Sequence, residues 1–168
     1  GYPELFAGDR RWMPWALGIA ERSFELSEFL VDELHIDDLG ATYSGLLAYH
    51  PSCHLLRGLG VDRQPMRLLQ LVREATITRL EPECCGFGGV FAIDFAEVSS
   101  EILKRKIQQI TASGASTVVG CDVSCLMHIE GGMRHAGLPH RSAHLAQILA
   151  NQKPGLRCRE QPLVGSIA

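Results

Sequence analysis

Five cysteines, which fall in three groups along the sequence, are the residues best suited by type and spacing to a chemical role. Cys84 and Cys85 are adjacent in "EPECCGFGGVFAIDF", and the other candidates are Cys53, Cys121 and Cys125. Adjacent cysteines rarely form a disulfide with each other, because the ring that closes is strained. The sequence is 46% hydrophobic, enough to fold unaided. Clustered cysteines in such a chain more often bind metal or do redox chemistry.

The number and spacing of these thiols indicate which metal they suit. Structural zinc sites use four ligands, often as two C-x-x-C pairs, and this sequence contains no C-x-x-C. Iron–sulfur clusters are held by cysteine thiolates and tolerate long spacings. The pattern therefore favours an iron–sulfur cluster, while zinc on four of the five thiols stays open. Cys158, near the C-terminus, is interpreted as a bystander.

Alternating strand and helix patterns must position these cysteines. Short β-branched or buried stretches predict strands, and apolar residues at 3–4 spacing predict helices. Their alternation indicates βαβ units, and so an α/β fold with a parallel sheet of about four strands and helices on both faces. Strands are expected at 42–50, 76–81, 115–121 and from 139; helices at 65–75, 95–114, 125–137 and up to 151.

Three regions follow from this pattern. Residues 1–40 are expected to be a helical segment, with a helix pair within 8–35, and 41–152 a cysteine-rich α/β domain. Pro154, Gly155 and Pro162 predict that residues 153–168 form a loose tail.

Each cysteine group follows a predicted strand. In an open parallel sheet ligands bind beyond the carboxyl ends of the strands, so we expect all five cysteines to converge at one edge. Cys53 and Cys125 are expected near helix starts, where the helix dipole favours thiolate. Gly86, Gly88 and Gly89 would allow positive φ and close approach of backbone N–H groups to sulfur.

Four histidines lie near the predicted cysteine edge. His54 directly follows Cys53 and is a candidate ligand, while His50, His128 and His144 are candidates for contacts to the ligands. An ordinary polar or core residue is the plainer interpretation of each. A different class of function, a nucleophilic Cys53 with His50 or His54 as base, would leave the other cysteines unexplained.

Composition argues against two classes of partner. The chain has 16 Lys and Arg against 19 Asp and Glu, and this net charge of −3 gives no reason to expect nucleic acid. No apolar run approaches the ~20 residues that span a bilayer, so no transmembrane segment is expected. We expect a cytoplasmic location, with any attachment to the inner membrane made through partners.

The motifs "YHPSCHLLRGLGV", "ECCGFGGVFA" and "GCDVSCLMHIEGGMRHAG" resemble the cysteine-rich CCG domains of lactate-utilisation protein A, the glycolate oxidase iron–sulfur subunit and the CCG-containing subunit of heterodisulfide reductase. "YPELFAG" and "CLMHIEGG" resemble the lactate-utilisation branch most. Members of that branch have two CCG motifs in tandem. The resemblance therefore implies that this chain is the C-terminal half, without its N-terminal CCG half.

The resemblance also implies ligands. In heterodisulfide reductase, a lone cysteine, the CCG pair and a closing C-x-x-C bind non-cubane [4Fe–4S] clusters. Cys53, Cys84 and Cys85 match the first three, and Cys125 is the best match to the closing motif. Cys121 departs from the pattern, because three residues separate it from Cys125. The cluster type, cubane or non-cubane, stays open with it.

The function that the resemblance implies is an iron–sulfur electron-transfer subunit in the oxidation of L-lactate to pyruvate. A ferredoxin-like iron–sulfur subunit is the implied partner. The fragment alone is expected to be inactive and to lose its cluster in air. The alternatives are a glycolate oxidase subunit and a structural zinc-binding or partner-docking domain without redox chemistry.

Overall fold

The computed structural model describes residues 1–151, which divide into two compact units, Gly1–His35 and the part that begins at Ile36. The tail that was expected to be loose, with Cys158, lies outside the described residues. Within residues 1–151, no helix is long and apolar enough to cross a membrane. All five candidate cysteines belong to the second unit.

The first unit is more broken than a continuous helix pair. It contains short helical segments: α1 (Tyr2–Leu5), α2 (Met13–Ala20), α3 (Leu26–Glu28) and the π-helical turn η1 (Phe29–Glu33). Pro14 lies in the first turn of α2, where a missing N–H costs nothing. The helical path is interrupted after α2 because Glu25 is extended, with ψ 150°, and its carboxylate accepts hydrogen bonds from two backbone N–H groups of α3.

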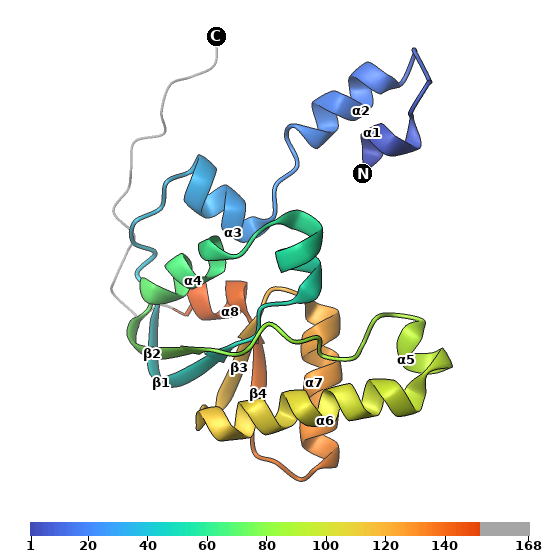
Figure 1. Ribbon diagram of the computed structural model, residues 1–168. Helices are drawn as coiled ribbons and strands as arrows, with labels where there is room; N and C mark the ends of the chain where they lie inside the picture. The colour runs from blue at the N-terminus through green and yellow to red at the C-terminus, as the bar shows by residue number, and fades with distance from the viewer. Residues whose placement is uncertain (152–168) are drawn as a thin grey trace. The chain divides into compact units, whose positions relative to one another are not determined.

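A four-stranded parallel sheet organises the second unit, as the sequence predicts (Figure 1). Its strands are β1 (Thr42–Tyr49), β2 (Arg73–Arg79), β3 (Thr117–Gly120) and β4 (Arg141–His144), in the spatial order β2–β1–β3–β4. The first strand lies inside the sheet, with β2 on one side and β3 on the other. Every residue of β3 is buried, as expected of a central parallel strand covered on both faces.

Helices cover this sheet in two groups. In one group α4 packs against β2 and α8, and in the other α7 packs against β3, β4 and α6 (Figure 1). The helical elements of this unit are η2 (His54–Leu59), α4 (Arg63–Gln70), α5 (Phe91–Asp94), α6 (Ala96–Ser113), α7 (Val123–His135) and α8 (Leu145–Leu149). The expected C-cap of α6 is present, because Gly114 adopts φ +72°.

The apolar core between α6, α7 and the sheet includes two of the candidate ligands. Cys85 and Cys125 are buried in one cluster with Ala48 and Val118 of the strands and Ile129 of α7. The other buried members of the cluster are Leu80, Ile110, Ala115 and Met133. These thiols are therefore held by core packing.

One boundary of the predicted pattern is wrong. The helix expected at 65–75 ends at Gln70, and the strand expected from 76 begins at Arg73. The N–H groups of Leu71 and Val72 close the last helical turn, and the Arg73 N–H instead donates to the Ala41 carbonyl at 3.0 Å. Pairing beside β1 thus starts the strand earlier than the residue types suggest.

Candidate metal centre

Three loops meet at the carboxyl ends of β1, β2 and β3. His50 follows β1, Cys85 lies in the loop after β2, and Cys125 lies in the first turn of α7, which follows β3. From β1 the chain continues to β2 on one side and later to β3 on the other, so the strand order changes direction at β1. Open α/β sheets bind ligands at such a switch point.

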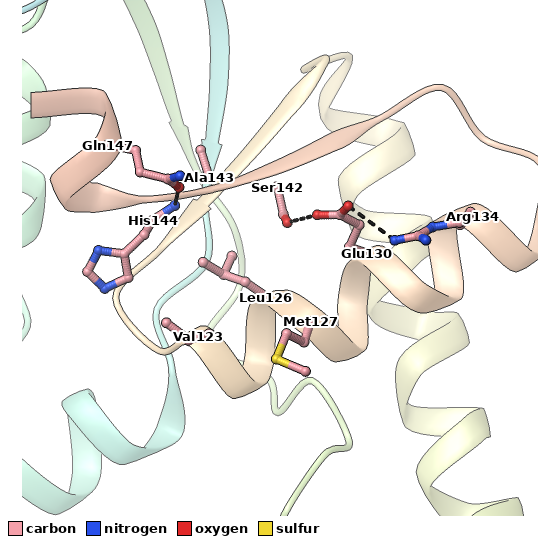
Figure 2. Close-up of a pocket in the computed structure, with 9 residues that line it drawn as sticks. All are labelled: Val123, Leu126, Met127, Glu130, Arg134, Ser142, Ala143, His144 and Gln147. Carbon is pink, nitrogen blue, oxygen red and sulfur yellow. Dashed lines mark hydrogen bonds and ion pairs between the residues drawn. The ribbon is translucent and has the colours of Figure 1, made fainter. Parts of the chain in front are cut away.

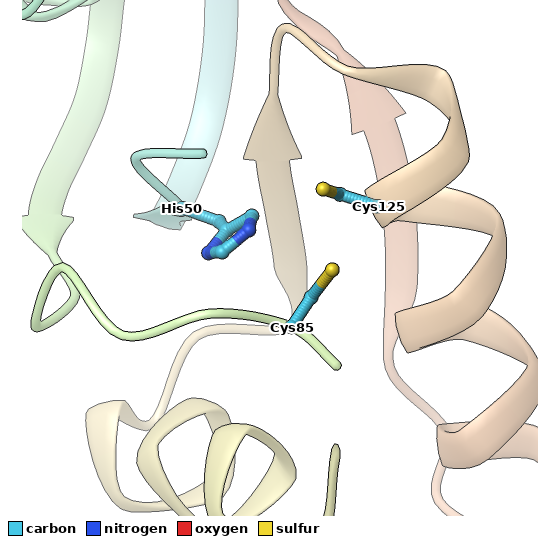
Figure 3. A group of neighbouring side chains, drawn as sticks. All are labelled: His50, Cys85 and Cys125. Carbon is cyan, nitrogen blue, oxygen red and sulfur yellow. The ribbon is translucent and has the colours of Figure 1, made fainter. Parts of the chain in front are cut away.

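The side chains of His50, Cys85 and Cys125 point toward one another (Figure 3). One ring nitrogen of the histidine and the two Sγ atoms all lie within 4.8 Å of one another. The exposed fractions of these residues are 1%, 2% and 7%, respectively. Nitrogen and sulfur donors held this close and away from water suit iron or zinc.

A hydrogen bond divides the charge between the two buried thiols. The Cys125 thiol donates to Cys85 and is the largest cause that lowers the pKa of Cys85; burial opposes it, and His50 and the Phe87 N–H assist. The same hydrogen bond, together with burial, raises the pKa of Cys125. Near neutral pH, Cys85 is therefore the thiolate of the pair and Cys125 the protonated partner.

Cys84 and Cys53 form the second, half-buried part of the cysteine group. Burial raises the pKa of Cys84, while the Gly86 N–H, which donates to its sulfur at 3.3 Å, works in the opposite direction. The neighbouring thiols of Cys85 and Cys53 raise this pKa further, and Cys53 lies within hydrogen-bonding reach of Cys84. Four of the five candidate cysteines are thus within electrostatic reach of one another.

Cys121 lies beside this group, at the end of β3. It is half-buried, and its carbonyl oxygen lies 2.8 Å from Nε2 of His144. Because Nδ1 of His144 accepts from the Ala146 N–H at 3.2 Å, Nε2 carries the proton and donates to that carbonyl. His144 thus fastens the backbone of the turn that leads to Cys125.

A second set of polar contacts joins the loop of Cys53 to the loop of Cys125. The Ser52 hydroxyl donates to one carboxylate oxygen of Asp122, and Nδ1 of His54 lies 3.3 Å from the other. The His54 side chain is 65% exposed and is directed to this carboxylate. His54 is therefore placed to hold two loops together rather than to join His50 and the buried thiols.

The glycine-rich loop after the double cysteine lies directly on α6. Gly86, Gly88 and Gly89 all have positive φ, as the sequence predicts. At Gly86 a Cβ atom would lie 2.6 Å from the Ser99 carbonyl oxygen, so no side chain fits there. The Ser99 hydroxyl donates to the Gly86 carbonyl at 2.8 Å, and His128 lies 3.5 Å from the same hydroxyl. His128 thus contacts the loop through Ser99.

Sequence reasoning missed three residues around the site: Ser52, Asp122 and Lys106. Ser52 and Asp122 adjoin the ligand motifs, but nothing in their spacing shows that they meet. Lys106 did have a signal in the sequence, because it falls on the apolar stripe of α6, and the structure shows it to be fully buried. Lysine is almost never fully buried unless it is paired, so its place on the buried face of an amphipathic helix needs an explanation.

An open pocket of about 510 Å³ lies between α7 and the β4–α8 segment (Figure 2). None of its lining residues is a cysteine; they are Val123, Leu126, Met127, Glu130, Arg134, Ser142, Ala143, His144 and Gln147. Glu130 accepts from Ser142 and is paired with Arg134 at 3.3 Å. The positive charge of Arg134 is therefore already paired with a carboxylate, so the pocket does not favour an anionic ligand.

The family model that describes a cysteine-rich CCG domain matches residues 47–130, half of the chain. The matched residues run from β1 into α7 and include all five candidate cysteines. The chain belongs to the CCG cysteine-rich domain family. The cysteine edge of its sheet is therefore the part of the molecule that this family model describes.

Curated relatives extend the similarity to most of the chain. It is 42% identical over 156 residues to lactate utilization protein A of Oceanobacillus iheyensis, covering 92% of this chain and 64% of the relative. It is 39% identical over 160 residues to the protein of the same name from Macrococcus caseolyticus, covering 94% and 65%. The chain thus spans less than two thirds of the length of these relatives.

The residues of this CCG domain fit a metal or an iron–sulfur group. Thiols and an imidazole are donors that such groups use. Neither ring nitrogen of buried His50 makes a regular hydrogen bond with a described residue. Buried polar atoms are nearly always paired. The Cys85 sulfur, whose pKa His50 helps to lower, is the neighbour that the described residues offer this imidazole, and a group held beside Cys85 and Cys125 would give it a regular partner.

Proposed function

We propose that this chain is the cluster-binding domain of an iron–sulfur electron-transfer subunit that takes part in L-lactate oxidation. The observation that carries the proposal is the convergence of Cys85 and Cys125, with Cys84 and Cys53 beside them, at the switch point of the sheet. The names of the relatives supply the link to lactate. A glycolate-oxidising complex is the alternative context for the same domain.

Cys53, Cys84, Cys85 and Cys125 would hold the cluster, and Cys121 is a fifth candidate ligand. A bound [4Fe–4S] group, cubane or non-cubane, supplies one-electron transfer. The polypeptide contributes a thiolate at Cys85, buried positions for Cys85 and Cys125, and loops fixed by Asp122, His144 and Ser99. A ferredoxin-like iron–sulfur subunit would exchange electrons with it in the cytoplasm, and a further CCG domain would complete the protein.

A zinc site is the second candidate, and one observation favours it. His50, Cys85 and Cys125 offer one nitrogen and two sulfur atoms within 4.8 Å of one another, a donor set common in structural zinc sites. Cys53 or Cys84 would be the fourth ligand. In that case the domain stabilises an assembly or docks partner subunits, without redox chemistry.

The test is the metal content of the full-length protein purified without oxygen. We expect iron and acid-labile sulfide in about equal amounts, near four per CCG motif, and a visible absorption that air removes. Cys84→Ser and Cys85→Ser should each remove most of the iron, while Cys158→Ser serves as the thiol control. Zinc near one per chain without sulfide would establish the structural alternative, and unchanged iron in both serine variants would refute the ligand assignment.

A further inference from the structure

A fully buried lysine lies beneath the double cysteine. Lys106, on α6, is 0% exposed and is the only lysine or arginine among the buried residues of the described chain. The neighbouring Lys104 has an exposed side chain and pairs with Glu101 on the surface. An ammonium group in a protein interior is costly unless charges and hydrogen bonds compensate for lost water. The position therefore has to be explained by what surrounds it.

Hydrogen-bond acceptors of the loop surround the Lys106 ammonium. Its Nζ donates to the Glu81 carbonyl at 2.9 Å and to Oε1 of Gln109 at 2.8 Å. The amide of Gln109 in turn donates to the Glu83 carboxylate at 2.8 Å. Lys106 and Gln109 thus attach both Glu81 and Glu83, just before Cys84, to α6.

One face of α6 carries this whole attachment. Ser99, Lys106 and Gln109 are seven and three residues apart, so they lie along one side of the helix. Ser99 fastens Gly86 after the double cysteine, and the other two fasten the residues before it. Cys84 and Cys85 are therefore carried by a segment that α6 holds at both ends.

The charges around Lys106 are those of the site. Burial lowers the pKa of Lys106, and the carboxylate of Glu83, the sulfurs of Cys85 and Cys84, and Glu81 raise it, in that order. The lysine is thus within electrostatic reach of both sulfurs of the CCG motif. Burial is the largest of these influences, so the pKa of Lys106 is lowered overall, while the nearby anionic groups and the two hydrogen bonds to oxygen acceptors stabilise the ammonium form against that loss.

We propose that Lys106 is the internal counter-cation of the cysteine site. It stabilises anionic sulfur at Cys84 and Cys85 from inside the core. For a bound cluster, which rests on the function proposed above, a fixed positive charge favours uptake of one electron and raises the reduction potential. Lys106 acts through its charge and through its hold on the loop, so it is a positioning residue.

Two variants separate charge from positioning. Lys106→Met removes the charge and the hydrogen bonds, and Lys106→Gln removes the charge but keeps an amide donor. Lys104→Gln, on the exposed face of the same helix, is the matched control. The first readout is the rate at which iodoacetamide alkylates Cys84, the half-buried thiol of the pair, in reduced apoprotein, followed by peptide mass. The second is the midpoint potential of the anaerobic holoprotein, titrated with dithionite as the electron donor.

The expected result is alkylation of Cys84 about tenfold slower at neutral pH in both Lys106 variants, equivalent to one unit of thiol pKa. The midpoint potential of the holoprotein should fall by about 59 mV, which is the equivalent of a tenfold change for a one-electron couple. Lys104→Gln should change neither. Wild-type rates in folded Lys106→Gln would overturn the proposal. The alkylation readout needs no cluster, so it decides the role of Lys106 even if the protein holds no iron; if Lys106→Met fails to fold, Lys106→Gln decides alone.

Discussion

Gly86 is the point at which the loop of the double cysteine lies closest to α6, and Gly86→Ala tests how strictly that approach is required. Its φ of +95° is strained for any residue with a side chain, and its added Cβ would lie 2.6 Å from the Ser99 carbonyl oxygen and 3.3 Å from Ile102. Positive φ costs an alanine about 1–2 kcal/mol. Forcing an extra carbon into packed backbone adds about 1–3 kcal/mol.

The matched control lies three residues away in the same loop. Gly89 also has positive φ, +63°, but a Cβ there would meet nothing within 4 Å. Gly89→Ala should therefore lose only the conformational part, about 1–2 kcal/mol. The difference between the two variants isolates the close approach to α6, and we expect it to be about 1–3 kcal/mol.

Urea unfolding of reduced apoprotein, followed by far-ultraviolet circular dichroism, measures both free energies of unfolding. Metal content of the folded variants is the second assay. Because Gly86 adjoins Cys85, a shifted backbone moves the buried thiolate away from Cys125 and His50. We expect iron or zinc loading to fall in Gly86→Ala and to stay near wild type in Gly89→Ala. Equal losses of stability in the two alanine variants would refute the reasoning.

Two further predictions concern α7. A Cβ at Gly132 would lie 2.6 Å from Cδ2 of Leu103 in α6, whereas one at Gly131 would meet nothing within 4 Å. Chemical denaturation should show Gly131→Ala to be more stable than wild type by about 0.5–1 kcal/mol. Gly132→Ala should be less stable than Gly131→Ala by about 1–3 kcal/mol, and equal effects of the two substitutions would contradict this packing. Cys125→Ala should raise the pKa of Cys85, because it removes the thiol donor that is the largest cause lowering that pKa. The pKa of Cys85 is lower in the folded than in the unfolded chain. The Cys85 thiolate therefore stabilises the fold fully at pH values above the ordinary thiol pKa, and this stabilisation is lost as the pH falls through the pKa of the folded state. Thiolate absorption against pH should show the titration of Cys85 shifted upward in Cys125→Ala, and an unshifted curve would exclude the hydrogen bond from Cys125 as the cause of the lowered pKa.

Much of the fold followed from local pattern. The four parallel strands, the long α6 with its glycine cap, and the positive φ values after the double cysteine were all predictable, because each depends on neighbouring residues. The boundary between α4 and β2 was not predictable, because the hydrogen bond from Arg73 to Ala41 decides it. Pairing with a strand far away in the sequence overrode the local preference there.

The residues around the cysteines show the same division. The types and spacing of Cys53, Cys84, Cys85 and Cys125 were enough to propose a thiol site, because strand ends of a parallel sheet share an edge. The contact of Ser52 with Asp122 could not be predicted, because it joins two loops only once the sheet has formed.

The sequence by itself determined that this is a cysteine-rich α/β protein with thiols at one edge of a parallel sheet, since residue type and periodicity encode both. Only the tertiary structure decided that Cys85 is the thiolate and Cys125 its donor, and that Lys106 lies buried beneath them. Such properties depend on burial and on distances between groups from different elements. A linear sequence does not contain them until the core has packed and water has been excluded.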